Sequence, residues 1–394
     1  MAANIYGNGI TTATAGANTI THYYDRAGIN AANRVNIYQQ FIDRKSMPQK
    51  YGKTFKISRF EHMYDRSTAS VDFATKGFLT SRDIADINAS LGAAVLAEGA
   101  GAVNVRTLQK VTFETQFNRY GEMIDYTDEV DIWSEDYIQV KYREELGELA
   151  NSRMEDLIQR DMLSTTTVIY SGAAASMATI GTGVALNGST DDQWTVSYDL
   201  IRKSVRKLVR NRAKKTTSII TGACKIGTSP VAKAYYAIIG ADVKSDLETL
   251  VRGTSYATKH AFIPAHEYAS TSTLADGEVG AMHEVRFIEA ESAAVYRQQG
   301  SAVPAGYFGN LQYTGVIGAG AAFDVFPILF PTEGAFASVG LKGLDRIKFN
   351  SKSPAALENG NPYGTTGFFS YNFFYAGIIL REEALLKVLV AAKN

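Results

Sequence analysis

Residues 134–165 read SEDYIQVKYREELGELANSRMEDLIQRDMLST and predict one long helix. Ser134 can cap its first turn, where the carboxylates of Glu135 and Asp136 also favour the helix dipole. About 30 residues rising 1.5 Å each give a helix of roughly 45 Å, long enough to be the spine of a unit. Apolar residues recur at steps of three and four without a proline: Ile138, Tyr142, Leu146, Leu149, Ala150, Met154, Leu157 and Ile158.

A strand predicted at 54–60 precedes this helix. Its sequence TFKISRF alternates apolar and polar side chains, as a half-exposed strand does. The matching partner is 108–117, where one face carries the side chains Val111, Phe113, Thr115 and Phe117. The Gly/Ala/Asp-rich segment between them, 63–105, includes a short helix-like stretch at 83–91 and is too long for a hairpin turn. We expect this excursion to reach out and contact another surface.

Residues 1–50 are rich in Ala, Asn, Thr, Gly and Tyr, and their basic side chains outnumber the acidic ones. Helical spacing is present only at 29–42, and Met47-Pro48 ends it. Such a segment cannot bury itself, so the sequence predicts an arm that lies on something else.

The remainder of the chain alternates helices and strands. A second helix is predicted at 197–212, with Ile201, Val205, Leu208 and Val209 facing inward, and Ser229-Pro230 is expected to start another over 232–239. This order indicates an α+β or α/β-like unit. Strands are predicted at 217–221, 284–289, 323–329 and 368–380, and a last strand or short helix at 384–390.

The composition is that of a folded chain with two or three layered units. It has 394 residues, of which 45% are apolar and 20% charged. Forty basic and forty acidic side chains give zero net charge. A chain with zero net charge does not produce the positive electrostatic field expected of a dedicated nucleic-acid binder, and it can self-associate more readily.

Cysteine and hydropathy exclude further classes. A single cysteine, Cys224, cannot form a disulfide within the chain or a cysteine cluster for zinc or iron–sulfur, so a reducing compartment fits best. Residues 1–16 lack the basic and apolar regions of a signal peptide, and charged residues or proline interrupt the longest apolar stretches. We therefore expect no membrane partner and no cofactor.

Enzymatic motifs are weak. His266-Glu267 begins like a zinc-protease helix motif, but Ser270 occupies the position of the second histidine. The glycine clusters at 99–101, 181–183 and 318–320 lack the phosphate-loop pattern, and there is no G-x-S-x-G elbow. For Cys224, packing as a small buried residue is favoured over nucleophilic catalysis. The acid/base candidates that remain are His22, His62, His260, His266 and His283.

Charge is distributed very unevenly. The region 125–161 has twelve acidic and four basic side chains, and Glu144, Glu145 and Glu148 lie near its centre. Basic side chains gather in the helix predicted at 197–212, in Arg202, Lys203, Arg206, Lys207, Arg210 and Arg212, and continue just beyond it. The acidic and the basic segment could be solvated faces or complementary docking surfaces between copies. The basic segment could also make a nonspecific contact with DNA phosphates.

Four short segments carry a resemblance to a known family. Residues 117–128, FNRYGEMIDYTD, resemble a stretch of the coliphage N-four type major capsid proteins, which have the Hong Kong 97-type fold. DGEVG at 276–280 with VRFIE at 285–289 is similar to a second motif of that family. RKSMP at 44–48 and GTTGF at 364–368, followed by FYAGIIL at 374–380, match its arm and its C-terminal motif.

The resemblance implies an organisation of the chain. It would comprise an N-terminal arm (1–50), an extended β-hairpin loop with flanking strands (51–122), and a peripheral domain (123–215) with a spine helix at 134–165. An axial α/β domain (216–350) and returning C-terminal strands (351–394) would follow. It implies no catalytic residues.

The function expected from this resemblance is that of a tailed-phage major capsid protein. Such a chain self-assembles into hexamers and pentamers of an icosahedral head shell that encloses double-stranded DNA. Its partners would be itself, portal and scaffolding or decoration proteins, and nonspecifically packaged DNA, and it would reside in the virion after assembly in the bacterial cytoplasm. The alternatives are an encapsulin-like compartment, another virion structural protein or, with less support, a cytoplasmic enzyme that uses His260, His266, Glu267 or His283.

Overall fold

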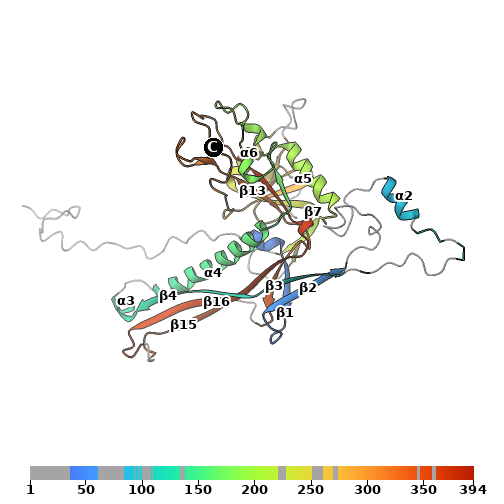
Figure 1. Cartoon of the computed structure of the whole chain (residues 1–394). Helices are drawn as coiled ribbons and strands as arrows, with labels where there is room; N and C mark the ends of the chain where they lie inside the picture. Colours follow the sequence, from blue (N-terminus) through green and yellow to red (C-terminus); the bar gives the residue numbers. More distant parts are fainter. Residues whose placement is uncertain are drawn as a thin grey trace, which may run out of the picture.

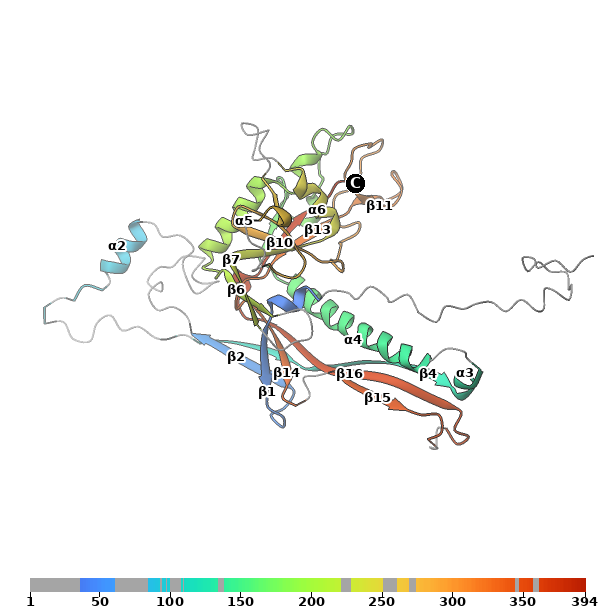
Figure 2. The same ribbon diagram turned by 180° about the vertical axis from the view of Figure 1, so that it is seen from behind.

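Two β-sheets organise the molecule, which is elongated (Figure 1). One sheet carries a long helix, α4, and the other lies in a more compact unit with two shorter helices (Figures 1 and 2). Helices and strands are thus mixed along the chain, in agreement with the α+β prediction. The structure, a computed structural model, describes residues 36–60, 84–92, 94–96, 98–99, 108, 110–133, 138–220, 228–250, 261–268, 274–343, 347–356 and 361–394.

Strand β16 (Thr366–Ile379) is the centre of a five-stranded sheet. It pairs antiparallel with β4 (Asn118–Thr127) over most of its length, with β15 (Lys348–Lys352) near its start and with β14 (Phe336–Leu341) near its end. Strand β1 (Asp43–Met47) adds to β14 in parallel. The result is a long, narrow sheet that ends beside the short helix α3 (Asp128–Trp133) (Figure 1).

Helix α4 (Ile138–Leu163) packs along this sheet and is the helix predicted at 134–165, although its predicted cap, Ser134, lies outside the described residues. Its buried side chains include Leu146, Ala150 and Ile158. They cover a row of aromatic residues that alternate along β16, and the Tyr126 ring of β4 stacks on the first of them at 5.3 Å between centroids. The row consists of Phe369, Tyr371, Phe373 and Tyr375, all buried.

The second sheet has eight strands, and residues 326–330 near its middle are all apolar and buried. Strand β7 (Thr228–Ile239) pairs in parallel with β10 (Val285–Glu289) and antiparallel with β13 (Phe326–Phe330) and β6 (Thr216–Ile220). Helices α5 (Tyr198–Arg210) and α6 (Ala241–Glu248) belong to this unit. The strand order is completed by β17 (Leu386–Val390) and β5 (Val168–Tyr170) beyond β13, and by β9 (Glu278–Met282) and β8 (Ile263–Pro264) beyond β10.

The predicted pairing of 54–60 with 108–117 is confirmed. Strands β2 (Thr54–Phe60) and β3 (Lys110–Gln116) form an antiparallel hairpin whose register runs from Thr54 opposite Gln116 to Phe60 opposite Lys110. A two-stranded hairpin is marginally stable alone. Its apolar side chains Phe55, Ile57 and Phe113 therefore pack on the five-stranded sheet. The helix predicted at 83–91 is α2 (Ile84–Gly92), and most of the remaining excursion lies outside the described residues.

The prediction for the arm is wrong in its described part. The helix expected to run to Ile42 is a single 3-10 turn, Tyr38–Phe41, followed by strand β1. Ile37, Tyr38 and Ile42 are buried in the main core, because the turn packs against both α4 and strand β6 of the eight-stranded sheet. Residues 36–47 are thus part of the folded body, while residues 1–35 lie outside the described part of the chain.

The helix predicted to start at Ser229-Pro230 is also wrong, because residues 228–239 form strand β7. Tyr235, Tyr236 and Ile238 are buried there and are aromatic or β-branched, residue types that favour a strand covered on both faces. Pro230 is accommodated opposite Ser218 of β6, and helix α6 begins only after the strand.

Most of the other predicted strands are present. Those at 217–221, 284–289 and 368–380 correspond to β6, β10 and β16, and the segment at 384–390 contains strand β17. The strand predicted at 323–329 is divided into β12 (Ala322–Phe323) and β13, and β12 pairs with β11 (Tyr313–Thr314). Asp324 causes the break, since its buried carboxylate accepts hydrogen bonds from Gln298 N (2.8 Å) and Thr314 Oγ1 (2.7 Å).

A glycine lets α4 approach β16 closely. A Cβ atom at Gly377 would lie against Asp161 Oδ2 of α4 and 2.8 Å from the Tyr375 hydroxyl. These two groups hydrogen-bond to each other at 3.0 Å, so neither is free to move away. Gly147 of α4, by contrast, has open space around it.

We predict that Gly377→Ala lowers the free energy of unfolding by about 1–3 kcal/mol, because the added methyl group separates the helix from the strand. Gly147→Ala is the matched control and should raise it by about 0.5–1 kcal/mol through helix propensity. Urea titrations followed by circular dichroism measure both. Equal midpoints for Gly377→Ala and the wild type would refute the close contact.

Candidate interaction surfaces

Helix α5 separates an apolar face from a strongly basic one. Ser197 caps it by accepting a hydrogen bond from Leu200 N at 3.2 Å. Ile201, Val205 and Leu208 are buried as predicted, but Val209 is 56% exposed and was wrongly expected to face inward. The buried stripe instead includes Ser204, whose hydroxyl donates to the Leu200 carbonyl oxygen at 2.8 Å.

The basic face of α5 lines a groove of about 730 Å³. The opposite wall is formed by β5 and by the small residues Gly172, Ala173 and Ala174. Lys207 is half-buried and donates a hydrogen bond to the Val168 carbonyl oxygen at 3.0 Å, which holds the helix against β5. The remaining cations of the groove are Lys203, Arg206 and Arg210, all exposed.

The predicted basic residues are not equivalent. Among the described residues, no carboxylate forms an ion pair with Lys203, Arg206 or Arg210. Arg202 lies outside the groove, with its guanidinium 3.6 Å from Asp199 Oδ1 and over the Tyr198 ring. Arg212 follows the helix with φ of 55°, and its carbonyl oxygen accepts a hydrogen bond from Arg381. The groove therefore gathers only part of the basic set.

The acidic face lies on the first half of α4. Glu144 and Glu145 are exposed and Glu148 is half-exposed. Lys141 forms an ion pair with Glu144 at 2.8 Å, whereas Glu145 and Glu148 have no ion pair with any described residue. This part of α4 lies beside α3, at the opposite end of the molecule from α5 (Figures 1 and 2). The structure does not bring the two charged faces together within one copy.

A buried carboxylate that the sequence did not single out binds residues 36–42. Glu155 of α4 is 4% exposed and accepts hydrogen bonds from the backbone amides of Tyr38 and Gln39. Gln159, one turn later, donates to the Tyr38 hydroxyl at 2.8 Å. Burial raises the pKa of Glu155 to about 7, and the two amides only partly offset this effect.

This carboxylate should make stability depend on pH. The folded pKa lies above the ordinary value of 4.5, so the stabilisation by Glu155 is complete below pH 4.5 and is lost as the pH rises through 7. We expect a loss on the order of 3 kcal/mol between pH 4 and 8. Urea midpoints of Glu155→Gln should vary less with pH than those of the wild type. Glu145→Gln, on the exposed face of the same helix, should behave like the wild type, and identical profiles for all three would contradict the assignment.

A second buried carboxylate ties the hairpin to the rest of the molecule. Glu383, whose side chain is 6% exposed, lies 2.9 Å from Arg59 of β2 and 3.5 Å from Arg381. The guanidinium of Arg59 also lies over the Phe113 ring of β3, at 5.3 Å from its centroid. The hairpin is thus fixed at one point by charge and along one face by apolar packing.

We predict that Glu383→Gln lowers the free energy of unfolding by about 1–3 kcal/mol, because two guanidinium groups lose their buried partner. It should also speed proteolysis at the hairpin. Lys56→Gln breaks an ion pair with Glu114 in the same hairpin whose side chains are 63% and 61% exposed. That control should change stability by less than about 1 kcal/mol, and an equal effect of both variants would show that burial does not matter here.

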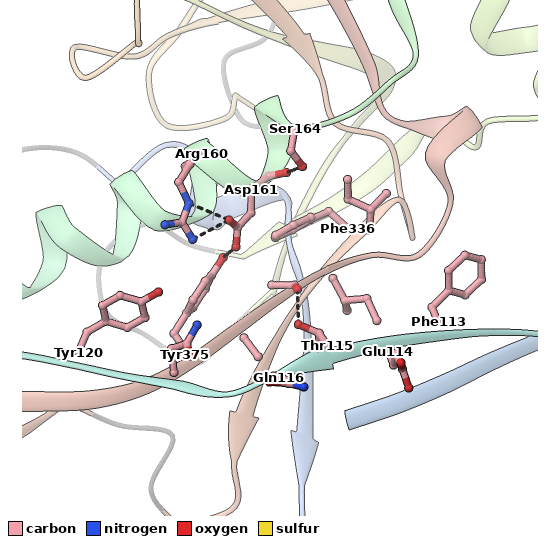
Figure 3. A pocket seen from close by; sticks show the side chains of 15 residues that line it. Phe113, Glu114, Thr115, Gln116, Tyr120, Arg160, Asp161, Ser164, Phe336 and Tyr375 are labelled. Atoms are coloured by element: carbon pink, nitrogen blue, oxygen red, sulfur yellow. Dashed lines mark hydrogen bonds and ion pairs between the residues drawn. The ribbon is translucent and has the colours of Figure 1, made fainter. Parts of the chain in front are cut away.

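Figure 3 shows the cavity of about 430 Å³ where the hairpin, the end of α4 and β16 meet. Arg160 pairs with Asp161 at 2.9 Å, and Asp161 also accepts the hydrogen bond from Tyr375. Thr115 of β3 donates to the Gly377 carbonyl oxygen at 2.9 Å. These polar groups satisfy one another, so the cavity is a junction between elements rather than a site with poised catalytic groups.

The enzymatic candidates are not brought together. His266 is exposed in a 3-10 turn, and His283 lies in the turn between β9 and β10 against the Tyr198 ring. Within the described residues, no three His, Cys, Asp or Glu side chains are placed to hold a metal ion. No helix among them has the length and apolar character needed to cross a membrane. The other candidates, His22, His62, His260 and Cys224, lie outside the described part of the chain.

Comparisons with known proteins agree on one class. No protein-family model matches the chain. The chain is 27% identical to a protein named major capsid protein of Pseudomonas phage KPP21, over 95% of this chain and 94% of that protein. The capsid structure of Ralstonia phage GP4 superposes with a TM-score of 0.58 at 13% identity and 98% coverage of both chains.

The fold is that of a phage capsid protein. The capsid structure of cyanophage P-SCSP1u also superposes, with a TM-score of 0.53 at 10% identity and 96% coverage of both chains. The acid-stable capsid of Helicobacter pylori phage KHP30 does so with a TM-score of 0.53 at 9% identity, covering 98% of each chain. Together with the relative from phage KPP21, these matches support a structural head-shell protein over a compartment protein or an enzyme.

Proposed function

We propose that this chain is the major capsid protein of a tailed phage, of the coliphage N-four type within the Hong Kong 97-type fold, and that copies assemble into hexamers and pentamers of an icosahedral shell. The observation that carries the proposal is the similarity to a phage major capsid protein over nearly the whole length of both chains. The four motifs at 44–48, 117–128, 276–289 and 364–380 support the narrower family.

The surface of a single copy supports a self-assembling role. At the α3 end of the long sheet, Trp133 is 82% exposed and Tyr363 is 88% exposed. The two belong to neighbouring segments, because Asp128 N donates to the Thr365 carbonyl oxygen at 3.0 Å. Large apolar side chains gathered on a surface mark interaction sites. In a shell, contacts with neighbouring copies would cover them.

The parts of the chain take the following proposed roles. The part of the N-terminal segment before residue 36 is the arm, 51–122 carry the extended loop over a neighbour, and the five-stranded sheet with the spine helix at 134–165 is the peripheral domain. The eight-stranded sheet with α5 and α6 is the axial domain, and the returning strands of 351–394 enter both sheets. The shell would enclose double-stranded DNA without base-specific contacts, and portal and scaffolding or decoration proteins would complete the head in the bacterial cytoplasm.

We expect the chain expressed alone to form closed particles or rings of five and six copies, visible by negative-stain electron microscopy. Light scattering on the same sample should give a mass far above 42.8 kDa. A species that stays monomeric at every protein concentration and salt concentration would contradict the proposal.

A hairpin variant tests the role of the excursion. The register places Phe60 opposite Lys110, so a short Asn-Gly turn can replace residues 61–109 without disturbing the pairing. This variant should fold with an unchanged urea midpoint but should not close shells, because the reach to the neighbour is gone. Normal shells from it would reject the assignment of 51–122 as the extended loop.

A further inference from the structure

The basic groove of α5 has the features of a binding site for another chain segment rather than those of a solvated helix face. Three of its cations, Lys203, Arg206 and Arg210, have no ion pair with any described residue. The wall facing them is built from a short strand and the small residues at 172–174, which leave room for another segment. Lys207 is the exception, because its ammonium group is used to hold α5 to β5.

The acidic face of α4 matches this groove in charge and spacing. Arg206 and Arg210 are separated by four residues on a helix, as are Glu144 and Glu148, so each pair is about 6 Å apart. Glu145 lies beside them and has no ion pair with a described residue. The three carboxylates therefore fit within the roughly 10 Å that Lys203 to Arg210 spans along α5.

These two faces lie at opposite ends of one copy, so a contact between them must join two copies (Figures 1 and 2). We propose that the basic groove of α5 receives the acidic face of α4 from a neighbouring copy, an inference that rests on the proposed self-assembly. Because the two surfaces differ, the contact is heterologous, and its repetition produces a ring or an open chain. Every copy supplies one groove and one acidic face, so all of them can be paired.

DNA phosphates are the competing occupant of the groove. They would satisfy the cations but would leave Glu145 and Glu148 without a partner, and they would gain nothing from the matched spacing of four residues. The zero net charge of the chain likewise favours pairing of charges between copies. The protein contact explains both faces at once.

The experiment exchanges the charges. One variant reverses the groove (Lys203→Glu, Arg206→Glu, Arg210→Glu), a second reverses the acidic face (Glu144→Lys, Glu145→Lys, Glu148→Lys), and a third combines both sets. Particle yield is measured by sedimentation and light scattering over a range of salt concentrations, and circular dichroism verifies that each variant is folded. A control reverses three exposed cations elsewhere, Arg297, Lys342 and Lys348.

We expect each single set to reduce particle yield at least tenfold, the combined variant to recover yield to within threefold of the wild type, and the control to assemble normally. Normal assembly of the groove variant overturns the inference. If that variant also loses packaged nucleic acid, measured by absorbance at 260 and 280 nm, the groove is a phosphate site instead. Folded single-set variants that fail without recovery in the combination also overturn it. Absence of wild-type particles would refute the proposed function itself.

A milder pair guards against misfolding of the triple variants. Arg206→Glu and Glu148→Arg each change one exposed or half-exposed side chain. Each alone should lower the yield and raise its sensitivity to salt, and together they should restore both. Additive losses in the double variant would overturn the inference.

Discussion

The antiparallel pairing of β4 with β16 joins two segments that lie about 240–260 residues apart in the sequence. It gives the long half of the molecule its length, because β4 pairs with residues 366–375 of β16, whereas β15 and β14 pair only with 368–372 and 376–379. The alternating aromatic residues of β16 determine the register, since a slip of one residue would turn the whole row from α4 to the solvent. Helix α4, the hairpin and the segment at 36–47 all pack against surfaces that this pairing creates.

Local patterns predicted the elements whose surroundings are simple. Helix α4, helix α5 and the β2–β3 hairpin each have one buried and one exposed face, so their periodicity is visible in the sequence. Strand β7 is buried on both faces, and its apolar run has no period that separates a strand from a helix. Its Ser229-Pro230 then resembled a helix start. At 36–42, the core formed by distant elements overrode the local helical spacing.

The interaction surfaces were predictable in composition but not in shape. The basic residues of α5 could be counted from the sequence, whereas the groove depends on β5 and residues 172–174, which reach it through the tertiary fold. Glu155 and Glu383 gave no sequence signal, because each stands directly beside another acidic residue and has no distinguishing motif. Only the backbone amides beside one and the two guanidinium groups beside the other distinguish them.

The position of β16 and β17 in the chain sets the order in which the protein can fold during synthesis. Strand β16 is the centre of one sheet, and β17 lies inside the other, between β5 and β13. Neither sheet is complete until residues 366–390 have left the ribosome, however early the hairpin and the helices form. The charged faces and exposed aromatic side chains of a growing chain are therefore present before either sheet is complete. If copies assemble into a shell as proposed, only those whose translation has passed both strands can enter it.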